Sequence, residues 1–413
     1  MEYAFSVIIP VFNKWNLTEQ CLRSLKACTS GYSYQVIIVD NASTDETRTS
    51  LDALATALFG GDAIPIRLPE NRNFGPACNL GAQRATAPFL FFLNNDTILT
   101  ENWAEPLLQA FSRNGNLAAA GPLLLYENNT VQHVGVTFTT SRPIHLYRHF
   151  PADHPAVQKE RRVQTLTGAA LLILREAFLS VGGFYEEYRN GFEDVDLCLH
   201  LCNLGLQLQC IPQSVIYHLE SQTPGRSDNT AHNSSILTHR CNSMFHPDLH
   251  IHGMRDGFMP VVVDNLDISL AMKEEEEARL FEQAEGKSIE YWRDLIVKNP
   301  LWLRGRAYIA DIAAQQGKYT LALLLYSEIA SWTKKSKDYK KLLSFAHMAG
   351  DSEKTLLDEA RKSLEVITAQ TRDLTYIRKK LRDMQKWNDR TLLQLYEAKY
   401  AELQKGLQAE TGL

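Results

Sequence analysis

The sequence predicts an α/β fold with a Rossmann-like, mostly parallel central sheet, followed by an all-α region. Over roughly the first 100 residues, short apolar runs alternate with amphipathic helical segments, a pattern typical of a parallel sheet covered on both faces. After about residue 265 the composition shifts to Ala, Leu, Lys and Glu, which favour helices. The chain of 413 residues is also long enough for two or three domains.

The individual elements follow from hydrophobic spacing and from capping residues. The expected strands are Phe5–Pro10, Gln35–Asp40, Ile64–Leu68, Phe89–Leu93, Ala169–Leu174 and Gln207–Ile211. The expected helices are Thr18–Ala27, a segment capped by Ser43 or Thr44 that runs through Leu58, Gly75–Ala85, and a helix from Glu193 that Gly205 ends. The Ser-, Thr- and Gly-rich stretch Ser221–Asn233 is typical of a mobile loop.

Polar side chains follow several of the expected strands. Asp40 and Asn41 come after the second strand, and Asn94, Asn95 and Asp96 come after the fourth. In open α/β sheets, ligands bind beyond the carboxyl ends of the strands. We therefore expect these side chains to converge on a binding site.

Six motifs occur in order along residues 4–230: SVIIPVFN, VIIVDNASTD, NRNFGPACNLG, FFLNND, GGFYEEYRNGFEDVDLCLHL and VIYHLESQTPGR. In content and order they resemble the family 2 glycosyltransferases, in particular the bacterial branch of rhamnosyltransferases and other surface-polysaccharide transferases. The resemblance implies the GT-A fold. It also implies transfer of a sugar from a nucleotide-diphosphate sugar to an acceptor hydroxyl, with inversion at the anomeric carbon.

The same resemblance assigns roles to single positions. Asp194 matches the general base, with Glu193 beside it, and Asp96 and His218 match ligands of a divalent cation, Mn²⁺ or Mg²⁺. The positions that match the nucleotide-sugar pocket are Pro10, Val11, Asn13, Asp40, Asn41, Asn73, Gly75, Asn79, Asn94, Asn95, Gly168 and Arg226.

Elementary chemistry explains these residue types. Breaking a sugar–diphosphate bond develops negative charge that a divalent cation on oxygen ligands can neutralise, and the attacking hydroxyl needs a base. Each residue also has an ordinary structural interpretation. Asp96 can close a turn, Asp194 can complement a helix N-terminus, and His218 can be a hydrogen-bonded core histidine.

Two positions depart from the family pattern. Asn94 stands where the family has its first metal-binding Asp, which leaves either a weaker metal site or Asp96 as the direct carboxylate ligand. Tyr185 stands where this branch often has Asp. The Asn94 substitution motivates an alternative, a catalytically degenerate scaffold whose helical C-terminal region binds a protein partner.

Four segments are expected: a catalytic domain over 1–255, a linker over 256–273, a tetratricopeptide-like region over 274–366, and a helix or short coiled coil over 367–413. The last segment carries a narrow apolar seam that includes Ile377 and Met384, which favours self-association. Docking onto an acceptor-carrying partner and peripheral membrane contact through the basic stretch Arg378–Lys386 remain open alternatives.

Composition narrows the partners. A net charge of −5 argues against a nucleic-acid partner, and no apolar run is long enough to span a bilayer. Without an evident signal peptide, and with seven scattered cysteines, the chain is expected in the cytoplasm, alternatively at the inner face of the membrane. The expected acceptor is a glycan, a lipid-linked glycan or a protein, and the donor base and sugar stay open.

Overall fold

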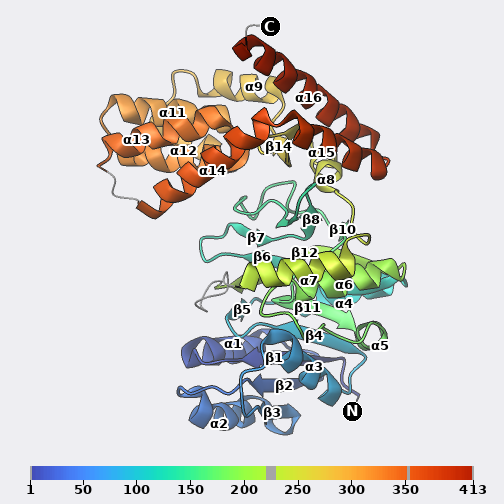
Figure 1. Ribbon diagram of the computed structural model, residues 1–413. Coiled ribbons are helices and arrows are strands. Elements are labelled where there is room, and N and C mark those ends of the chain that lie inside the picture. Colours follow the sequence, from blue (N-terminus) through green and yellow to red (C-terminus); the bar gives the residue numbers. More distant parts are fainter. Residues whose placement is uncertain (1, 220–228, 351–353, 412–413) are drawn as a thin grey trace. The chain divides into compact units, whose positions relative to one another are not determined.

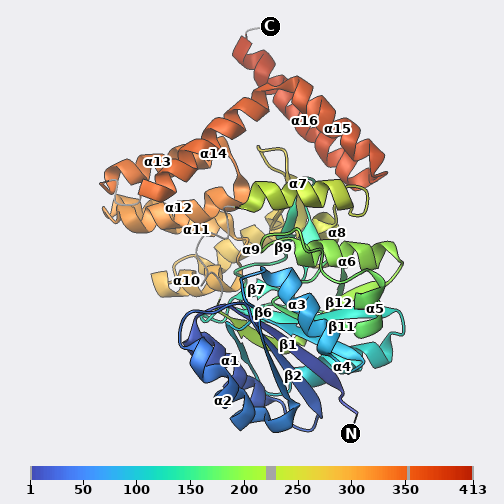
Figure 2. The ribbon, with the colours of Figure 1, turned by 60° about the horizontal axis from the view of Figure 1, so that its bottom comes forward.

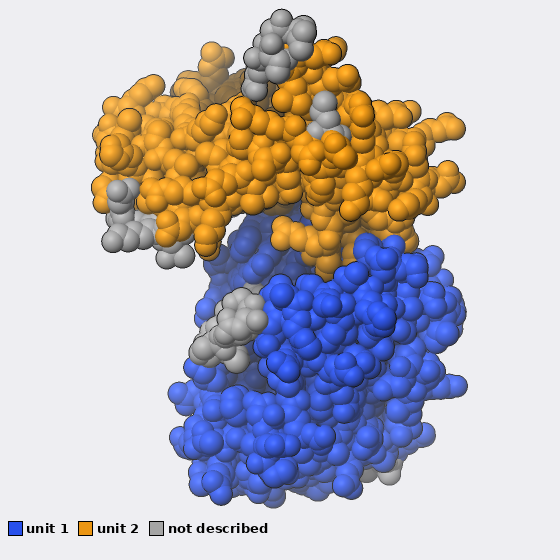
Figure 3. All heavy atoms as spheres, viewed as in Figure 1, with its two compact units in different colours: residues 1–137, 144–245 blue, residues 138–143, 246–413 orange. Residues whose placement is uncertain are grey.

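The computed structural model describes residues 2–219, 229–350 and 354–411, so the predicted site residue Arg226 lies outside the described residues. The chain divides into two compact units (Figure 3). The first unit holds residues 1–137 and 144–245, and the second holds residues 138–143 and 246–413. The segment predicted as a linker, 256–273, therefore lies inside the second unit.

The elements of the chain up to residue 245 are shown in Figure 1. The strands are β1 (Phe5–Val11), β2 (Tyr34–Asp40), β3 (Ala63–Arg67), β4 (Phe89–Leu93), β5 (Thr97–Leu99), β6 (Leu117–Leu125), β7 (Val131–His133), β8 (Val136–Phe138), β9 (Pro143–His145), β10 (Arg161–Val163), β11 (Ala170–Leu174) and β12 (Gln207–His218). The helices are α1 (Trp15–Cys28), α2 (Thr47–Phe59), η1 (Gly60–Asp62), α3 (Phe74–Arg84), α4 (Ala104–Arg113), α5 (Arg175–Ser180), α6 (Glu193–Asn203) and α7 (Thr230–Cys241).

Ten of these strands form one sheet in the order β10-β12-β6-β11-β4-β1-β2-β3, with β5 paired to β12 and β7 paired to β6. Strands β4, β1, β2 and β3 are parallel, as predicted, whereas β11 runs antiparallel to both β4 and β6. The predicted α/β fold is therefore confirmed, and the sheet as a whole is mixed.

Side chains alternate between the two faces of the central strands. On β1, Val7 and Ile9 belong to the core that includes residues of α1 and α2, while Ile8 faces α3. Gly81 makes this second contact close, because a Cβ there would lie 2.5 Å from Ile8 Cγ2. Figures 1 and 2 show α1 and α2 grouped together, with α3 apart from them across the strands.

Two local predictions are wrong. Helix α2 begins at Thr47 and not at a cap on Ser43 or Thr44, because the Ser43 hydroxyl accepts a hydrogen bond from the Asn13 N–H at 2.8 Å instead. In addition, the last four residues of the predicted loop Ser221–Asn233 are helical, since α7 starts at Thr230.

The second unit is mostly helical. Its elements are α8 (Leu249–Arg255), β13 (Met259–Val262), β14 (Ile268–Ala271), α9 (Glu274–Ala284), α10 (Ile289–Lys298), α11 (Leu303–Gln315), α12 (Tyr319–Thr333), α13 (Ser336–Met348), α14 (Lys354–Arg372), α15 (Leu374–Lys386) and α16 (Arg390–Thr411). Consecutive helices from α11 to α14 share one apolar core. Among the described residues, no helix has the length and apolar character needed to cross a membrane.

The predicted apolar seam is filled within one chain. Helix α15 packs along α16, and Ile377, Met384, Leu392 and Tyr396 are all buried at 0–1% exposure. Self-association through this seam stays a prediction. Ile377 and Met384 are already buried within the chain and are not exposed for contact with a second copy.

Candidate active site

The loops that follow β1 and β2 are tied together by Asn13. Its side-chain oxygen accepts hydrogen bonds from the N–H groups of Thr44 at 2.7 Å and Asp45 at 3.3 Å. Asn13 and Lys14 both adopt left-handed backbone conformations, which Asn tolerates better than most residues. The predicted pocket residue Asn13 thus fixes the shape of the loop at the end of β1.

Asp40, at the end of β2, is 2% exposed and fully engaged. One carboxylate oxygen accepts from the Ser43 N–H at 2.8 Å, and the other pairs with Arg67 Nη1 at 2.9 Å. Arg67, at the end of β3, escaped the sequence analysis, although a basic residue closing an apolar strand was a visible signal. A contact of Asp40 with a nucleotide stays a prediction.

Asn41 joins the ends of three strands. Its N–H donates to the carbonyl of Val11 at 2.7 Å, its amide nitrogen donates to the carbonyl of Asn73 at 3.0 Å, and its amide oxygen accepts from the Arg72 N–H at 2.8 Å. The predicted pocket residues Val11, Asn41 and Asn73, with half-buried Pro10 next in the chain, are therefore brought to one edge of the sheet.

Helix α3 meets the segment that precedes α6. The Asn79 side chain donates to the carbonyl of Phe184 at 2.8 Å and accepts from the Phe184 N–H at 2.9 Å. A Cβ on Gly75 would lie 3.3 Å from Phe184 Cβ. Asn79 therefore holds the segment around Phe184 in place, and Gly75 permits its close approach. A role of these two residues beneath a nucleoside stays a prediction.

Strand pairing brings Asp96 and His218 together. Strand β5 runs antiparallel to the end of β12, with Thr97 opposite His218, and the Leu219 N–H donates to the Asp96 carbonyl at 2.9 Å. As a result, Asp96 Oδ1 lies 3.1 Å from His218 Nε2, with the two side chains 15% and 6% exposed. Asn94 Nδ2 lies 3.3 Å from the same ring nitrogen.

This pair fits a divalent cation. Adjacent ligands of an octahedral ion, each about 2.1 Å from the metal, lie roughly 3 Å apart, close to the separation of Asp96 Oδ1 and His218 Nε2. A carboxylate with an imidazole suits Mn²⁺. Neighbouring Asn95 instead donates to the Thr18 hydroxyl at 2.8 Å, which anchors the turn to α1.

The predicted base Asp194 is linked to this site by two consecutive residues. Gly168 donates its N–H to Asp194 Oδ2 at 2.8 Å, and the next carbonyl, that of Ala169, accepts from the Asn94 N–H at 2.9 Å. A Cβ on Gly168 would lie 3.2 Å from the ring of Phe74, so the small residue permits this close approach. Asp194 itself is half-buried.

Glu193 shapes the turn that leads into α6. It is 7% exposed, and its carboxylate accepts from the Gly191 N–H at 2.6 Å. Asn190, Gly191 and Phe192 all have positive φ. Asn190 and Phe192 are not glycine, so this turn is strained, and the Glu193 bond helps to hold it. The structure thus gives Glu193 a supporting contact next to Asp194.

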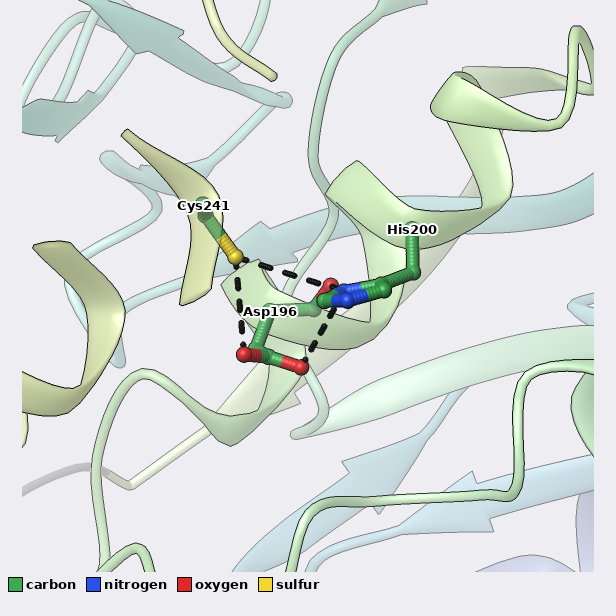
Figure 4. Close-up of side chains that lie close together, drawn as sticks. All are labelled: Asp196, His200 and Cys241. Atoms are coloured by element: carbon green, nitrogen blue, oxygen red, sulfur yellow. Dashed lines mark hydrogen bonds and ion pairs between the residues drawn. The ribbon is translucent and has the colours of Figure 1, made fainter. Parts of the chain in front are cut away.

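A second group of potential metal ligands lies between α6 and α7 (Figure 4). The ligand atoms of Asp196, His200 and Cys241 lie within 4.8 Å of one another. However, Arg240 donates to both Asp196 oxygens, at 2.7 and 3.1 Å, and Tyr188 donates to one of them at 3.0 Å. Burial also raises the pKa of the Cys241 thiol to about 12, which disfavours the thiolate that would bind a metal. Together with the hydrogen bonds to Asp196, this indicates a structural network.

Residues 6–181 match the family model described as Glycosyl transferase family 2. The O-antigen biosynthesis protein RfbC of Myxococcus xanthus is 30% identical over 223 residues, which cover 52% of this chain and 17% of that protein. The pre-mycofactocin glycosyltransferase of Mycobacterium tuberculosis is 26% identical over 217 residues, which cover 52% and 42%. Residues 6–181 are thus similar to family 2 glycosyltransferases, and the chain spans less than half the length of these curated relatives.

Two solved structures show limited similarity. One is GalNAc-T7 with UDP, GalNAc and Mn²⁺, with a TM-score of 0.45, 18% identity and coverage of 53% of this chain and 44% of that one. The other is the mannosyltransferase PcManGT of Pyrobaculum calidifontis with GDP-Man and Mn²⁺, with a TM-score of 0.44, 16% identity and coverage of 86% and 89%.

Proposed function

We propose that the protein is an inverting, metal-dependent glycosyltransferase that moves a sugar from a nucleotide-diphosphate sugar to an acceptor hydroxyl. The observation that carries this proposal is the short backbone bridge Gly168–Ala169, which ties the Asp194 carboxylate to the Asn94 segment beside Asp96 and His218. A base and a cation site are then held together at the carboxyl ends of the strands, where α/β folds bind ligands.

In the proposed reaction the acceptor oxygen attacks the anomeric carbon in a single displacement. The bond between that carbon and the diphosphate oxygen breaks, and its electron pair leaves with the diphosphate. Asp194 takes the proton of the attacking hydroxyl. Asp96 and His218 would hold Mn²⁺ or Mg²⁺, which neutralises the charge that develops on the leaving group.

We further propose a bacterial surface glycan or glycoconjugate as the acceptor class. The name of the relative RfbC, an O-antigen biosynthesis protein, supports this class. A lipid-linked acceptor would bring the protein to the inner face of the membrane, whereas a soluble saccharide would not require it.

The base is tested by Asp194→Asn. The amide keeps the shape and can still accept from the Gly168 N–H, but it cannot take a proton, so we expect donor binding to persist and transfer to fall by at least about 100-fold. Asp153→Asn, at an exposed turn, serves as the control. Near-wild-type transfer by Asp194→Asn would show that another group is the base.

The donor site is tested by thermal shift with UDP, GDP, dTDP and CMP, with and without Mn²⁺, on wild type and Asp96→Ala. A metal-dependent shift with one nucleotide, absent in the variant, would support the proposal and identify the nucleotide class. If no nucleotide shifts the wild type, the alternative of a degenerate scaffold gains weight. The next experiment would then seek a protein partner of residues 246–413.

A further inference from the structure

Gln132 contacts His218 at two points. Gln132 lies in the middle of β7 and is 4% exposed, and His218, at the end of β12, is 5% exposed. The Gln132 amide nitrogen donates to the His218 main-chain carbonyl at 3.0 Å. The Gln132 amide oxygen lies 2.6 Å from His218 Nδ1.

These two contacts require a hydrogen on Nδ1 of the ring. A carbonyl oxygen only accepts hydrogen bonds, so the amide nitrogen of Gln132 has to face the His218 carbonyl. Its amide oxygen is then left facing Nδ1 and also only accepts, so Nδ1 has to carry a hydrogen. With the opposite tautomer, two lone pairs would face each other at 2.6 Å.

We propose that Gln132 is a positioning residue that holds His218 in the tautomer protonated at Nδ1, which leaves the lone pair of Nε2 directed at the cation site. This inference rests on the proposed function for its ligand, a divalent cation. Nε2 is the ring nitrogen that lies 3.1 Å from Asp96 Oδ1 and 3.3 Å from Asn94 Nδ2. Metal-binding histidines commonly have their other nitrogen fixed by such a second partner.

The chain reaches this arrangement through strand order. Strands β7 and β12 are both neighbours of β6, and β5 pairs with β12 on its far side from β6. Gln132 therefore approaches His218 from one direction and Asp96 approaches from another. The His218 ring thus lies between Gln132, which faces Nδ1, and Asp96, which would bind the same cation as Nε2.

The first test measures the tautomer directly. Protein labelled with ¹⁵N-histidine is studied by long-range ¹H–¹⁵N NMR in the presence of diamagnetic Mg²⁺, which would separate Nε2 from the Asp96 carboxylate, and the His218 signals are assigned by their loss in His218→Gln. We expect the pattern of an Nδ1–H ring in wild type and a shift toward the Nε2–H pattern in Gln132→Leu. An Nε2–H pattern in wild type would overturn the proposal.

The second test measures Mn²⁺ affinity by electron paramagnetic resonance, in the presence of the nucleoside diphosphate that the thermal-shift panel selects. Gln132→Leu should weaken binding about 10–100-fold, the usual effect of removing such a partner. Gln132→Glu keeps an oxygen acceptor for Nδ1 and should recover part of that loss. Gln35→Leu removes another buried amide, one that accepts from Ser6 and Thr86, and should leave the affinity unchanged.

The outcomes separate the two proposals. Unchanged Mn²⁺ affinity in folded Gln132→Leu would overturn the role of Gln132 while leaving the metal site intact. If wild type binds no Mn²⁺, the proposed metal site fails, and with it the role of Gln132 toward a cation. If Gln132→Leu does not fold, the wild-type tautomer and Gln132→Glu still decide.

Discussion

Polar side chains at the strand ends form hydrogen bonds to main-chain groups that their sequence positions do not predict. Asp40 and Asn41 were predicted to contact a nucleotide, and in the structure both bond to main-chain groups of the loops at the strand ends. A sequence shows that such a residue follows a strand but not which loop will lie beside it. The sequence could therefore place these side chains at the ends of neighbouring strands, but it could not give the hydrogen-bond partner of each.

Asp45 provides a test of this scaffold role. Burial alone would raise the pKa of its carboxyl, but hydrogen bonds from Thr47 and Trp15 outweigh burial and lower it below 3.8. Because the folded state then binds a proton less readily than the unfolded state, Asp45 stabilises the protein above about pH 3.8, and this contribution is lost as the pH falls through the lower folded pKa.

We expect Asp45→Asn to lower the free energy of unfolding by about 1 kcal/mol near neutral pH, and by less as the pH drops below about 3.8. Urea unfolding of both proteins across the pH range measures the difference. A difference that stays constant down to about pH 2.5 would contradict the assignment.

Arg240 provides a second test at the same scale. It pairs with nearly buried Asp196, and its guanidinium lies 3.7 Å from the ring centroid of Tyr185. Arg240→Met should cost about 2–3 kcal/mol, because a buried carboxylate loses its partner. Arg23→Met, in the exposed pair with Glu19, should cost less than about 0.5 kcal/mol.

A chelator tests the same cluster for a metal. If a chelator destabilised the nucleotide-free protein as strongly as Arg240→Met does, Asp196, His200 and Cys241 would hold a metal.

Among the elements, most of the long apolar strands were predicted, but β6 (Leu117–Leu125) was missed, and the three-residue strands gave no pattern to recognise. Strand β4 has the predicted bounds, because FLFFL is short, rich in aromatic residues and followed by the turn residues Asn94 and Asn95. Strands β5 and β7 have three residues each, too few for a recognisable pattern. These short strands nevertheless place Asp96 and Gln132 beside His218. In the sequence, 124 residues separate Asn94 from His218.

The contact between α3 and the sheet gives a prediction for an element. Gly81→Ala would place a methyl group 2.5 Å from a buried methyl of Ile8, a branched side chain on a central strand with little freedom to move. We expect a loss of about 1–3 kcal/mol in unfolding free energy, measured by denaturant unfolding. Gly115→Ala, where nothing lies within 4 Å, is the matched control, and equal effects would contradict the packing argument.

In the whole molecule, the composition shift after residue 265 predicted the helical region correctly. It could not predict that residues 138–143 belong to the same unit as residues 246–413. The contacts responsible are specific: Thr140 Oγ1 lies 2.6 Å from the Tyr396 hydroxyl, and Asp267 accepts from the hydroxyls of Thr139 and Thr140. The local sequence of residues 138–143 does not predict that they pair with Asp267 and Tyr396.

Tyr396→Phe tests this assignment. The change removes a buried hydroxyl that also donates to the Leu266 carbonyl at 2.8 Å, so we expect the second unit to lose about 1–2 kcal/mol. Nucleotide-induced stabilisation of the first unit should persist. Tyr400→Phe, whose hydroxyl accepts from exposed Arg378, is the control. An equal loss in both variants would speak against a special role for Tyr396.

The assignment of residues 138–143 to the second unit also bears on how the chain is made. During synthesis the first unit is complete once residue 245 has left the ribosome, but Tyr396 follows roughly 150 residues later, about 8–30 s at ordinary translation rates. Throughout that interval the Thr140 hydroxyl lacks its Tyr396 partner, although Asp267, the partner it shares with Thr139, is made much earlier. A chain whose synthesis ends in this stretch would therefore contain the whole first unit and the segment 138–143, but not the tyrosine that Thr140 contacts.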